Sequence, residues 1–292
     1  MRPIRANKTL GQNFLKSRRA LGQIVRAAEI VPASATGERE TVLEIGPGKG
    51  VLTRVLLDAG ARVVAVEKDE RLVELLQETF AAEIAAGTLV LKAGDILELD
   101  LASDAARALF PADSTYKLVA NIPYYITGQI IRTFLSAPAH IQPTRMVLLL
   151  QKEVVDRIIA RDGKESLLSL AVKAYGQPKK MGVVKREDFS PAPNVDSAIL
   201  LVANISKEFF AHKNPAGQDT AGAHISEHIF FDTLHAGFAH KRKKMLRNLE
   251  AIAPIETLTK IFAEENISEN ARAEDMSLAQ WRKIAAGISR AQ

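Results

Sequence analysis

Residues 41–53, Thr-Val-Leu-Glu-Ile-Gly-Pro-Gly-Lys-Gly-Val-Leu-Thr, restrict the fold of this chain more than any other stretch. A short apolar strand runs directly into a glycine-rich turn, and a helical pattern follows. Glycines let the backbone come close to a ligand, and the start of a helix presents N–H groups that have no partner within the helix. The stretch therefore predicts a nucleotide-binding strand–turn–helix unit.

The spacing of the glycines narrows the choice of ligand. A dinucleotide fingerprint that begins at Gly46 would need glycine where Val51 stands, and a Walker loop would need serine or threonine where Gly50 stands. The pattern Gly46-x-Gly48-x-Gly50 fits a small adenosyl ligand without a pyrophosphate.

The next predicted strand, 62–66, ends in an acidic residue that suits the same ligand. Glu67 lies 21 positions after Gly46. An acidic residue at that distance, at the tip of the second strand, is placed to accept hydrogen bonds from both ribose hydroxyls. Lys68 follows it directly and is included in the predicted binding site.

A third strand, 88–91, leads to Gly94, Asp95 and Ile96. The Asp95 carboxylate could accept from an adenine amino group while Ile96 packs on the ring. Each acidic residue alone could be a surface carboxylate. Three acidic or glycine-rich strand ends in succession favour a binding site instead.

The apolar run 117–120 looks like a buried strand, and the polar motif Asn121-Ile122-Pro123-Tyr124 follows it. Such a motif suits the methylation of an exocyclic amine. If the Asn121 side-chain oxygen and the Ile122 carbonyl each accept one N–H, the nitrogen becomes more tetrahedral and its lone pair is directed. Pro123 makes the preceding carbonyl rigid, and Tyr124 can stack on the base. The alternative is a strand followed by a proline turn, and the motif alone does not decide between them.

Strands and helices alternate up to about residue 175, and a pair of strands follows. This order predicts an α/β fold with a mostly parallel, doubly wound sheet, an antiparallel edge and a ligand at the carboxyl ends of the strands. The further strands are expected at 145–150, 182–185 and 197–203, and helices at 17–30, 127–135, 153–160 and 166–175.

Beyond residue 205 the strand-like alternation stops, which predicts a small helical domain. The expected domains are residues 1–205, with a basic N-terminal arm, and residues 206–292. The helices of the second domain are expected at 229–238, 241–252, 255–264 and 278–288.

Positive charge is concentrated in two segments. The net charge is +5 and the pI about 9.3, which favours an anionic partner such as nucleic acid. The segment before Glu29 has seven basic residues and no acidic one, and the expected helix 241–252 begins with a second group. Either group could instead be a solvated surface. As RNA contacts we predict Arg5, Lys8, Lys16, Arg18, Arg19, Lys241, Arg242, Lys243, Lys244 and Arg247.

Several classes of protein are disfavoured. The absence of cysteine excludes disulfides and thiolate zinc sites, and no apolar run reaches the ~18 residues of a membrane span. The amino terminus lacks the apolar core of a signal peptide. The segment from His224 to His228 matches a metalloprotease pattern, but a third ligand and an apolar strand beside it are missing, so no metal is expected.

Taken together, the motifs resemble the ribosomal RNA adenine N6,N6-dimethyltransferases, and within them the branch that modifies small-subunit (16S) rRNA. The resemblance runs from Gly11 to about Arg247 and depends on five motifs in the family's order. These are Gly11-Gln-Asn-Phe-Leu15, Glu44-Ile-Gly-Pro-Gly48, Asn121-Ile-Pro-Tyr124, Leu150-Gln-Lys-Glu-Val154 and Phe189-Ser-Pro-Ala-Pro-Asn-Val-Asp-Ser197.

The resemblance implies a Rossmann-like methyltransferase fold with a seven-stranded sheet, and S-adenosylmethionine as cofactor. It implies cofactor contacts from Gln12, Asn13, Leu15, Gly46, Gly48, Glu67, Lys68, Asp95, Ile96 and Asn121. It also implies that Asn121 and the Ile122 carbonyl orient the target amine while Tyr124 and Phe189 sandwich the base. Ile122, Ala192 and Asn194 depart from the family's usual Leu, Pro and Lys.

The implied reaction is the dimethylation of two adjacent adenosines in the 3′-terminal hairpin loop of 16S rRNA, within a 30S precursor. We expect a cytoplasmic monomer that needs no general base. The nearest alternative is the antibiotic-resistance methyltransferase of large-subunit rRNA, and a DNA adenine methyltransferase is less favoured. From another class, the chain could be a non-catalytic rRNA-binding assembly factor on the same fold.

Overall fold

A computed structural model describes residues 4–31, 38–100, 103, 109–110, 115–211, 225–240 and 242–291. The chain forms two compact units, residues 1–155 with 177–205, and residues 156–176 with 206–292. Within the described residues, no helix is both long enough and apolar enough to span a membrane.

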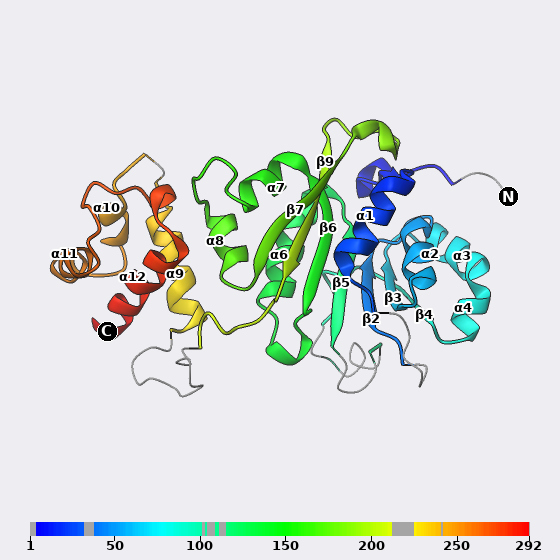
Figure 1. Ribbon diagram of the computed structural model, residues 1–292, viewed down its shortest axis with the longest axis horizontal. Helices are drawn as coiled ribbons and strands as arrows, with labels where there is room; N and C mark the ends of the chain where they lie inside the picture. The colour runs from blue at the N-terminus through cyan, green and yellow to red at the C-terminus, as the bar shows by residue number, and fades with distance from the viewer. Residues whose placement is uncertain are drawn as a thin grey trace. The chain divides into compact units, whose positions relative to one another are not determined.

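The first unit contains a seven-stranded sheet (Figure 1). Its strand order is β4-β3-β2-β5-β6-β9-β7. Pairing is parallel from β4 through β6 and antiparallel for β6 with β9 and β9 with β7. The strands are β2 (Thr41–Ile45), β3 (Arg62–Glu67), β4 (Leu89–Ala93), β5 (Tyr116–Asn121), β6 (Arg145–Gln151), β7 (Gln177–Val184) and β9 (Ser197–Ala203).

The sequence-based prediction of a mostly parallel sheet with an antiparallel edge is confirmed. The edge strand β7 is longer than expected, and it carries an irregularity between Lys180 and Gly182. A second sheet, which the sequence did not predict, pairs β1 (Phe14–Leu15) with β8 (Phe189–Ser190) in antiparallel register.

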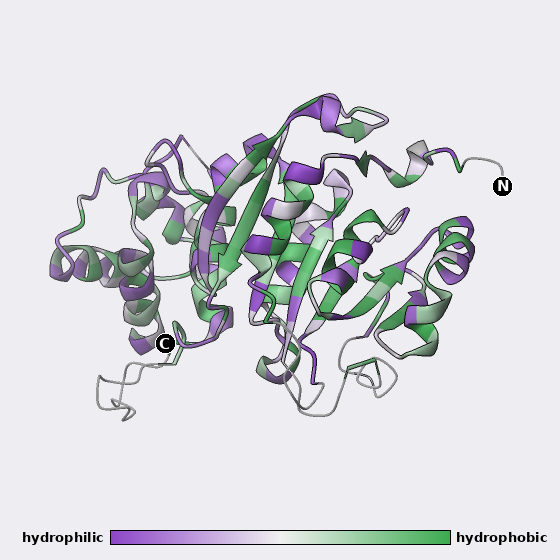
Figure 2. Ribbon diagram, turned by 45° about the vertical axis from the view of Figure 1, so that its right-hand side comes forward, coloured by the Kyte–Doolittle hydropathy of each residue, from purple (hydrophilic) through white to green (hydrophobic). Residues whose placement is uncertain are grey.

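Helices cover the sheet, with α1 lying against β5, β6, β9 and β7. The central strands are largely hydrophobic along their length (Figure 2), and their apolar residues are buried, as are apolar residues of α1, α2, α3 and α6. The helices of this unit are α1 (Arg18–Ala28), α2 (Val51–Asp58), α3 (Glu70–Thr79), α4 (Ala81–Ala85) and α6 (Thr127–Leu135), with the 3-10 turns η1 (Lys8–Leu10), η2 (Tyr124–Ile126), η3 (Ala139–Ile141) and η4 (Arg186–Asp188). Helix α7 (Lys152–Ile158) crosses the boundary between the units.

The topology fixes where a ligand can bind. From β2 the chain moves outward to β3 and β4, and then returns to the other side of β2 as β5. A crevice opens at such a reversal, beyond the carboxyl ends of the strands. The register pairs Ile45 with both Val66 and Ala120, so Gly46, Glu67 and Asn121 stand at one edge of the sheet.

The second unit is helical. Its core surrounds the buried Trp281, which stacks on Phe238 with ring centroids 5.5 Å apart. Its elements are α8 (Leu167–Lys173), α9 (Glu227–Gly237), α10 (Met245–Leu249), α11 (Ile255–Glu264), η5 (Ala273–Asp275) and α12 (Leu278–Ala291).

Two expectations for this part of the chain differ from the structure. Residues 156–176, expected in the first domain, pack with the second unit, because the Glu165 N–H donates to the Glu274 carbonyl at 2.7 Å and Tyr175 Oη donates to Glu227 at 2.9 Å. The helix expected at 241–252 contains only α10. The backbone of Lys244 is extended, so the helix begins only at Met245. Positive charge in the first turn of a helix is disfavoured by the helix dipole, which opposes a longer helix that would include these cations.

Candidate active site

A cavity of about 340 Å³ lies at the carboxyl edge of β2, β3, β4 and β5. Its wall is completed by the N-terminal arm, which we define as residues 4–16. Every residue that the sequence predicted to bind cofactor lines this cavity, namely Gln12, Asn13, Leu15, Gly46, Gly48, Glu67, Lys68, Asp95, Ile96 and Asn121.

The glycine turn forms the floor of the cavity. Gly46 and Gly48 have φ values of 65° and 62°, in the left-handed region that side chains disfavour. A Cβ on Gly48 would come within 3.2 Å of the Phe14 ring, so a side chain at this position would force the arm to shift away from the turn. Helix α2 begins immediately afterwards, at Val51, and its first N–H groups have no partner within the helix.

Glu67 is held rigidly at the end of β3. Its carboxylate accepts hydrogen bonds from the Gly48 N–H at 3.0 Å and the Asp69 N–H at 2.9 Å. Burial raises the pKa of Glu67, and these two backbone donors oppose the shift. The carboxylate is thus fixed next to the glycine turn, where the sequence placed a ribose contact.

Asp95 lies at the end of β4 and already has partners. Its carboxylate accepts from Lys68 Nζ at 2.7 Å and from the Leu97 N–H at 2.9 Å. Desolvation would raise the pKa of Asp95, but these two hydrogen bonds outweigh it and the pKa is lowered. Asp95 is therefore a charged acceptor, and the buried Ile96 lies beside it in the cavity wall.

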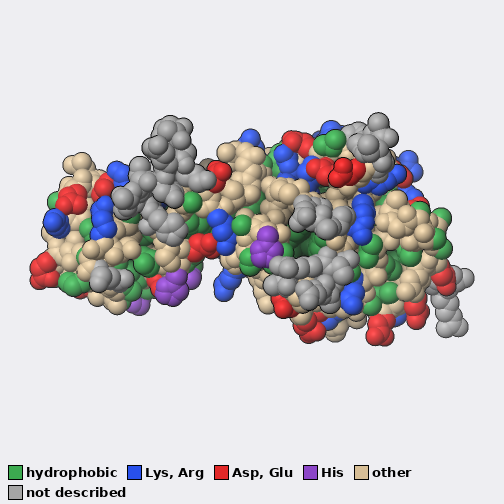
Figure 3. Space-filling model, turned by 90° about the horizontal axis from the view of Figure 1, so that it is seen from below, with side chains coloured by type: hydrophobic (Ala, Val, Ile, Leu, Met, Phe, Trp, Pro, Cys, Tyr) green, Lys and Arg blue, Asp and Glu red, His purple; other side chains and the backbone are tan. Residues whose placement is uncertain are grey.

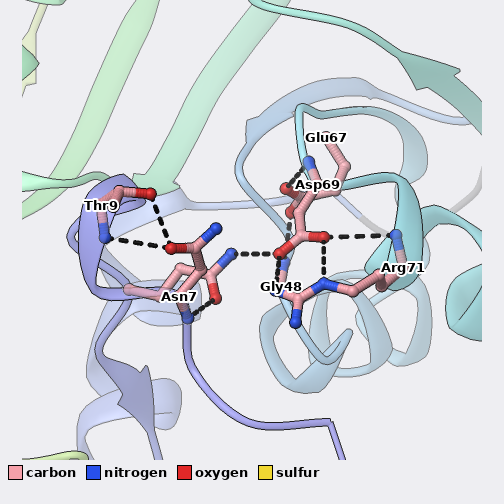
Figure 4. A network of polar contacts seen from close by, with 7 residues as sticks. Asn7, Thr9, Gly48, Glu67, Asp69 and Arg71 are labelled. Carbon is pink, nitrogen blue, oxygen red and sulfur yellow. Dashed lines mark hydrogen bonds and ion pairs between the residues drawn. The ribbon is translucent and has the colours of Figure 1, made fainter.

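The arm is attached to the rest of the first unit at two points. Gln12 Nε2 donates to Asp69 Oδ2 at 2.9 Å, a contact between parts of the chain that are far apart in sequence (Figure 4). Just after Gln12, β1 pairs Phe14 with Ser190 and Leu15 with Phe189. The arm is therefore a structural part of the site, which its basic composition did not reveal.

The amine-orienting motif lies at the end of β5. Asn121 Nδ2 donates to the Asn13 carbonyl at 3.1 Å, so the amide oxygen is the end that can accept from a substrate. Ile122 is buried, Pro123 and Tyr124 line the cavity, and Tyr124 Oη is 2.8 Å from Ser197 Oγ. The motif therefore faces the same space as the predicted cofactor residues.

Phe189 is placed differently from the other predicted residues. It belongs to β8, opposite Leu15, and its side chain is only 3% exposed. The cavity wall does not include it. The structure brings Tyr124 to the cavity but keeps the Phe189 ring packed in the core.

Sequence reasoning missed several residues of the cavity wall. Glu44 is fully buried in β2, its Oε2 accepts from Thr53 Oγ1 at 2.7 Å, and its Oε1 has no partner among the described residues. Burial raises the pKa of Glu44 to about 8. Lys49 Nζ lies 4.8 Å from the centre of the Phe14 ring, and the Tyr125 side chain is 66% exposed. An acidic residue within an apolar strand was the available signal for Glu44.

The predicted RNA-contacting residues lie on the surface of both units. The described side chains are exposed in Arg5, Lys16, Arg18, Arg19, Arg242, Lys243, Lys244 and Arg247. Lys8 begins η1, and Lys241 lies outside the described residues. On the face that Figure 3 shows, basic side chains lie among acidic ones, and Arg247 itself pairs with Glu250 at 2.8 Å. Among the described residues, no cluster of acidic or histidine side chains could hold a metal ion.

The fold and the site together define an S-adenosylmethionine-dependent methyltransferase of the kind that acts on exocyclic amines. The model of the ribosomal RNA adenine dimethylase family matches residues 4–289, and the chain belongs to that family. The predicted enzyme class and the predicted cofactor are thereby confirmed.

Similar proteins cover almost the whole chain. A protein of Dehalococcoides mccartyi (strain CBDB1) named ribosomal RNA small subunit methyltransferase A is 35% identical over 96% of this chain and 88% of its own length. A protein of the same name from Synechococcus elongatus is 37% identical over 94% and 92%.

Two solved structures share the fold. A dimethyladenosine transferase from Plasmodium falciparum superposes with a TM-score of 0.72 at 23% identity, over 93% of this chain and 95% of its own. The 23S rRNA methyltransferase ErmE gives 0.69 at 23% identity, over 95% and 100%. At this identity the likeness shows the fold alone.

Proposed function

We propose that this protein dimethylates N6 of two adjacent adenosines in the 3′-terminal hairpin loop of 16S rRNA. The observation that carries the proposal is the Asn121 amide, held by the Asn13 carbonyl at 3.1 Å in the wall of the cavity. The relatives named above, which are called small-subunit methyltransferases, support the choice of the small subunit over the large one.

The residues of the chain can activate a poor nucleophile through geometry. The lone pair of an adenine amine is delocalised into the ring. When the Asn121 side-chain oxygen and the Ile122 carbonyl each accept one N–H, the nitrogen moves towards a tetrahedral shape and its lone pair points into the cavity. The methylated ammonium is strongly acidic and loses its proton to water, so positioning and electrostatics supply most of the rate and no general base is required.

The cavity fits S-adenosylmethionine, which supplies an electrophilic methyl group on a positively charged sulfur. The open glycine turn at Gly46 and Gly48 admits its methionine end. We propose that Glu67 binds the ribose hydroxyls and that Asp95 and Ile96 contact the adenine. The buried Oε1 of Glu44, which has no partner among the described residues, suits an ammonium group.

The target base requires two stacking surfaces, for which we propose Tyr124 and Phe189. Tyr124 is half-buried at the cavity wall and can provide one face. Phe189 is 3% exposed and paired through β8 with the arm, so its ring must be uncovered before a base can reach it. Entry of the base would therefore require a local rearrangement of the β1–β8 pair.

The RNA would contact the exposed basic residues of the arm, of α1 and of the segment before α10. We propose a 30S precursor in the cytoplasm as the substrate and a monomer as the active form. The one rival from another class is a non-catalytic rRNA-binding assembly factor. The intact amine-orienting motif favours the enzyme, because a binding protein has no need for it.

Methyl transfer to unmethylated small subunits tests the proposal. We expect mass spectrometry of the rRNA nucleosides to detect dimethyladenosine at two neighbouring positions. Asn121→Ala should lower kcat roughly 10²–10³-fold, the usual cost of losing one orienting group, whereas the exposed Asn270→Ala should act like the wild type. Label only on large-subunit RNA would favour the antibiotic-resistance type, and no label would favour the assembly factor.

A further inference from the structure

One hydrogen bond joins the arm to the strand end that carries Glu67. Gln12 Nε2 donates to Asp69 Oδ2 at 2.9 Å (Figure 4). Within the described residues, it is the one hydrogen bond between residues 4–12 and the body of the first unit. We call this contact the arm clasp.

The arm side of the clasp is held in a fixed direction. The Asn7 N–H donates to Gln12 Oε1 at 2.7 Å, and the Gln12 N–H donates to the Asn7 carbonyl at 3.3 Å. Because Oε1 is already an acceptor, the Gln12 amide is oriented with its NH2 group towards Asp69. Rotating the amide would break both side-chain contacts at once.

The Asp69 side of the clasp is equally well fixed. The side chain is 5% exposed and caps the N-terminus of α3, accepting from the Arg71 N–H at 3.2 Å. Arg71 Nε and Nη2 also donate to it, at 2.9 and 2.6 Å. The pKa of Asp69 is lowered, chiefly by the hydrogen bond from the Arg71 side chain. Desolvation opposes this shift, and the hydrogen bond from Gln12 adds to it. Its own N–H donates to Glu67 at 2.9 Å, so the anchor and the predicted ribose contact form one network.

The residues held by the clasp are those that the reaction requires. Asn13, directly after Gln12, provides the carbonyl that holds Asn121 Nδ2 at 3.1 Å. Phe14 covers Gly48, and Leu15 lines the cavity before entering the pair with β8. If residue 12 moved, both the cavity wall and the support of the Asn121 amide would move with it.

We infer that Asp69 is a positioning residue for methyl transfer. Its side chain does not line the cavity, and it acts through Gln12 to keep the arm over the cofactor and the Asn121 amide in its orienting direction. This inference rests on the proposed function. The competing explanation is that Asp69 only caps α3 and that its contact with Gln12 is incidental.

Exchanging the donor at position 12 and the acceptor at position 69 distinguishes a positioning role of Asp69 from a role in helix capping alone. Gln12→Glu keeps the acceptor for the Asn7 N–H but places a second carboxylate against Asp69. Asp69→Asn keeps the helix cap, because asparagine caps as well as aspartate. Arg71 Nη2 donates to the same Asp69 oxygen as Gln12, so the double variant is made in the Arg71→Gln background, where no guanidinium opposes an NH2 group at that place. There the side-chain NH2 of the introduced asparagine can donate to the carboxylate at position 12, so the clasp is rebuilt with its direction reversed.

The readouts are calorimetric affinity for S-adenosylhomocysteine, KM and kcat on unmethylated small subunits, and thermal unfolding. We expect Gln12→Glu to weaken S-adenosylhomocysteine binding about tenfold or more and to lower kcat as well, since a lost hydrogen bond to a charged group has an effect of that size. The double variant should recover most of both losses, and the unfolding temperatures should stay close together.

Arg71→Gln is the matched control, because it removes the other partner of Asp69 and leaves the clasp intact. It should bind S-adenosylhomocysteine like the wild type. An undiminished affinity in Gln12→Glu, or a double variant no better than Gln12→Glu, would overturn the inference. A wild-type protein that methylates no small-subunit rRNA would instead contradict the proposed function, while the calorimetric comparison would still decide the clasp.

Discussion

The N-terminal arm and the segment 242–247 have similar charges but different structural roles. Both are rich in lysine and arginine, and both were predicted from that composition to contact RNA. In the arm, the uncharged residues Gln12, Asn13 and Leu15 form a wall of the cavity. In segment 242–247, the apolar Met245 and Leu246 are buried in the second unit, which anchors the neighbouring cations there.

Charge composition thus identifies a surface but not its role. Arg5 and Lys16 in the arm are exposed, as are the four cations of segment 242–247, so electrostatics alone would treat the two segments alike. The neighbouring uncharged residues make the difference, because they decide where each segment is attached. Changes in the arm should therefore affect cofactor and RNA, whereas changes at 242–247 should affect RNA only.

Removal of the arm should have the largest effect. Deleting residues 1–12 eliminates the clasp and frees the Asn13 carbonyl that supports Asn121, so we expect methyl transfer to fall at least about 100-fold, since a small misplacement at a reacting centre has consequences of that size. Affinity for S-adenosylhomocysteine, measured by calorimetry, should fall as well. If the deletion raised only the KM for RNA, the arm would not differ in role from segment 242–247.

Neutralising the second segment should have an intermediate effect. In the triple variant Arg242→Gln, Lys243→Gln, Lys244→Gln, we expect the affinity for a 16S rRNA fragment to fall about tenfold. Each lost phosphate contact removes about 0.7 from the slope of log K against log salt, so three contacts reduce it by about 2. Affinity for S-adenosylhomocysteine should not change, and Lys260→Gln, an exposed lysine of α11, serves as the control. A weaker affinity of the triple variant for S-adenosylhomocysteine would show that segment 242–247 also affects the cofactor site, as the arm does.

A single cation in the arm should have a smaller effect. Lys16 is exposed, and its N–H donates to the Asp188 carbonyl at 2.7 Å, so its backbone stays fixed when the side chain changes. Lys16→Gln should weaken RNA binding by a few-fold and reduce the salt slope by about 0.7. Filter binding at several salt concentrations measures both. An unchanged slope would mean that this cation does not contact a phosphate.

The smallest effect concerns stability and its dependence on pH. Because the pKa of buried Glu44 is raised from its usual value near 4.5 to about 8, the folded protein binds this proton more tightly than the unfolded chain does. Raising the pH from 4.5 to 8 therefore lowers the free energy of unfolding. Glu44→Gln removes this titration while keeping an acceptor for Thr53.

We expect the Tm of the variant to rise relative to that of the wild type as the pH increases from 5 to 8.5, because only the wild type must then hold a buried carboxylate in its charged form. The difference should shrink towards pH 5. Calorimetric melts at several pH values measure it. A difference that is the same at every pH would show that Glu44 does not titrate in this window.

Much of the first unit could be predicted from the sequence because its signals are local. The apolar runs that end at Ile45, Glu67 and Asn121 predicted strands, which the structure contains. The residues at the ends of these runs were predicted to bind cofactor, and they line one cavity. The second unit was less predictable. The expected helix included the cations before Met245, but the helix begins at Met245. The buried Asn248 side chain donates to the Gly237 carbonyl at 2.7 Å and so holds the turn that precedes the helix.

The sequence alone determined the class of ligand, the strand ends that hold it and the amine-orienting motif, because these depend on glycine spacing and on residues adjacent in the chain. Only the tertiary structure decided that Gln12 meets Asp69, that Phe189 is packed in the core, and that Glu44 is buried with a raised pKa. Contacts between segments far apart in sequence, and the desolvation that they cause, arise from how the whole chain packs. No local pattern specifies them.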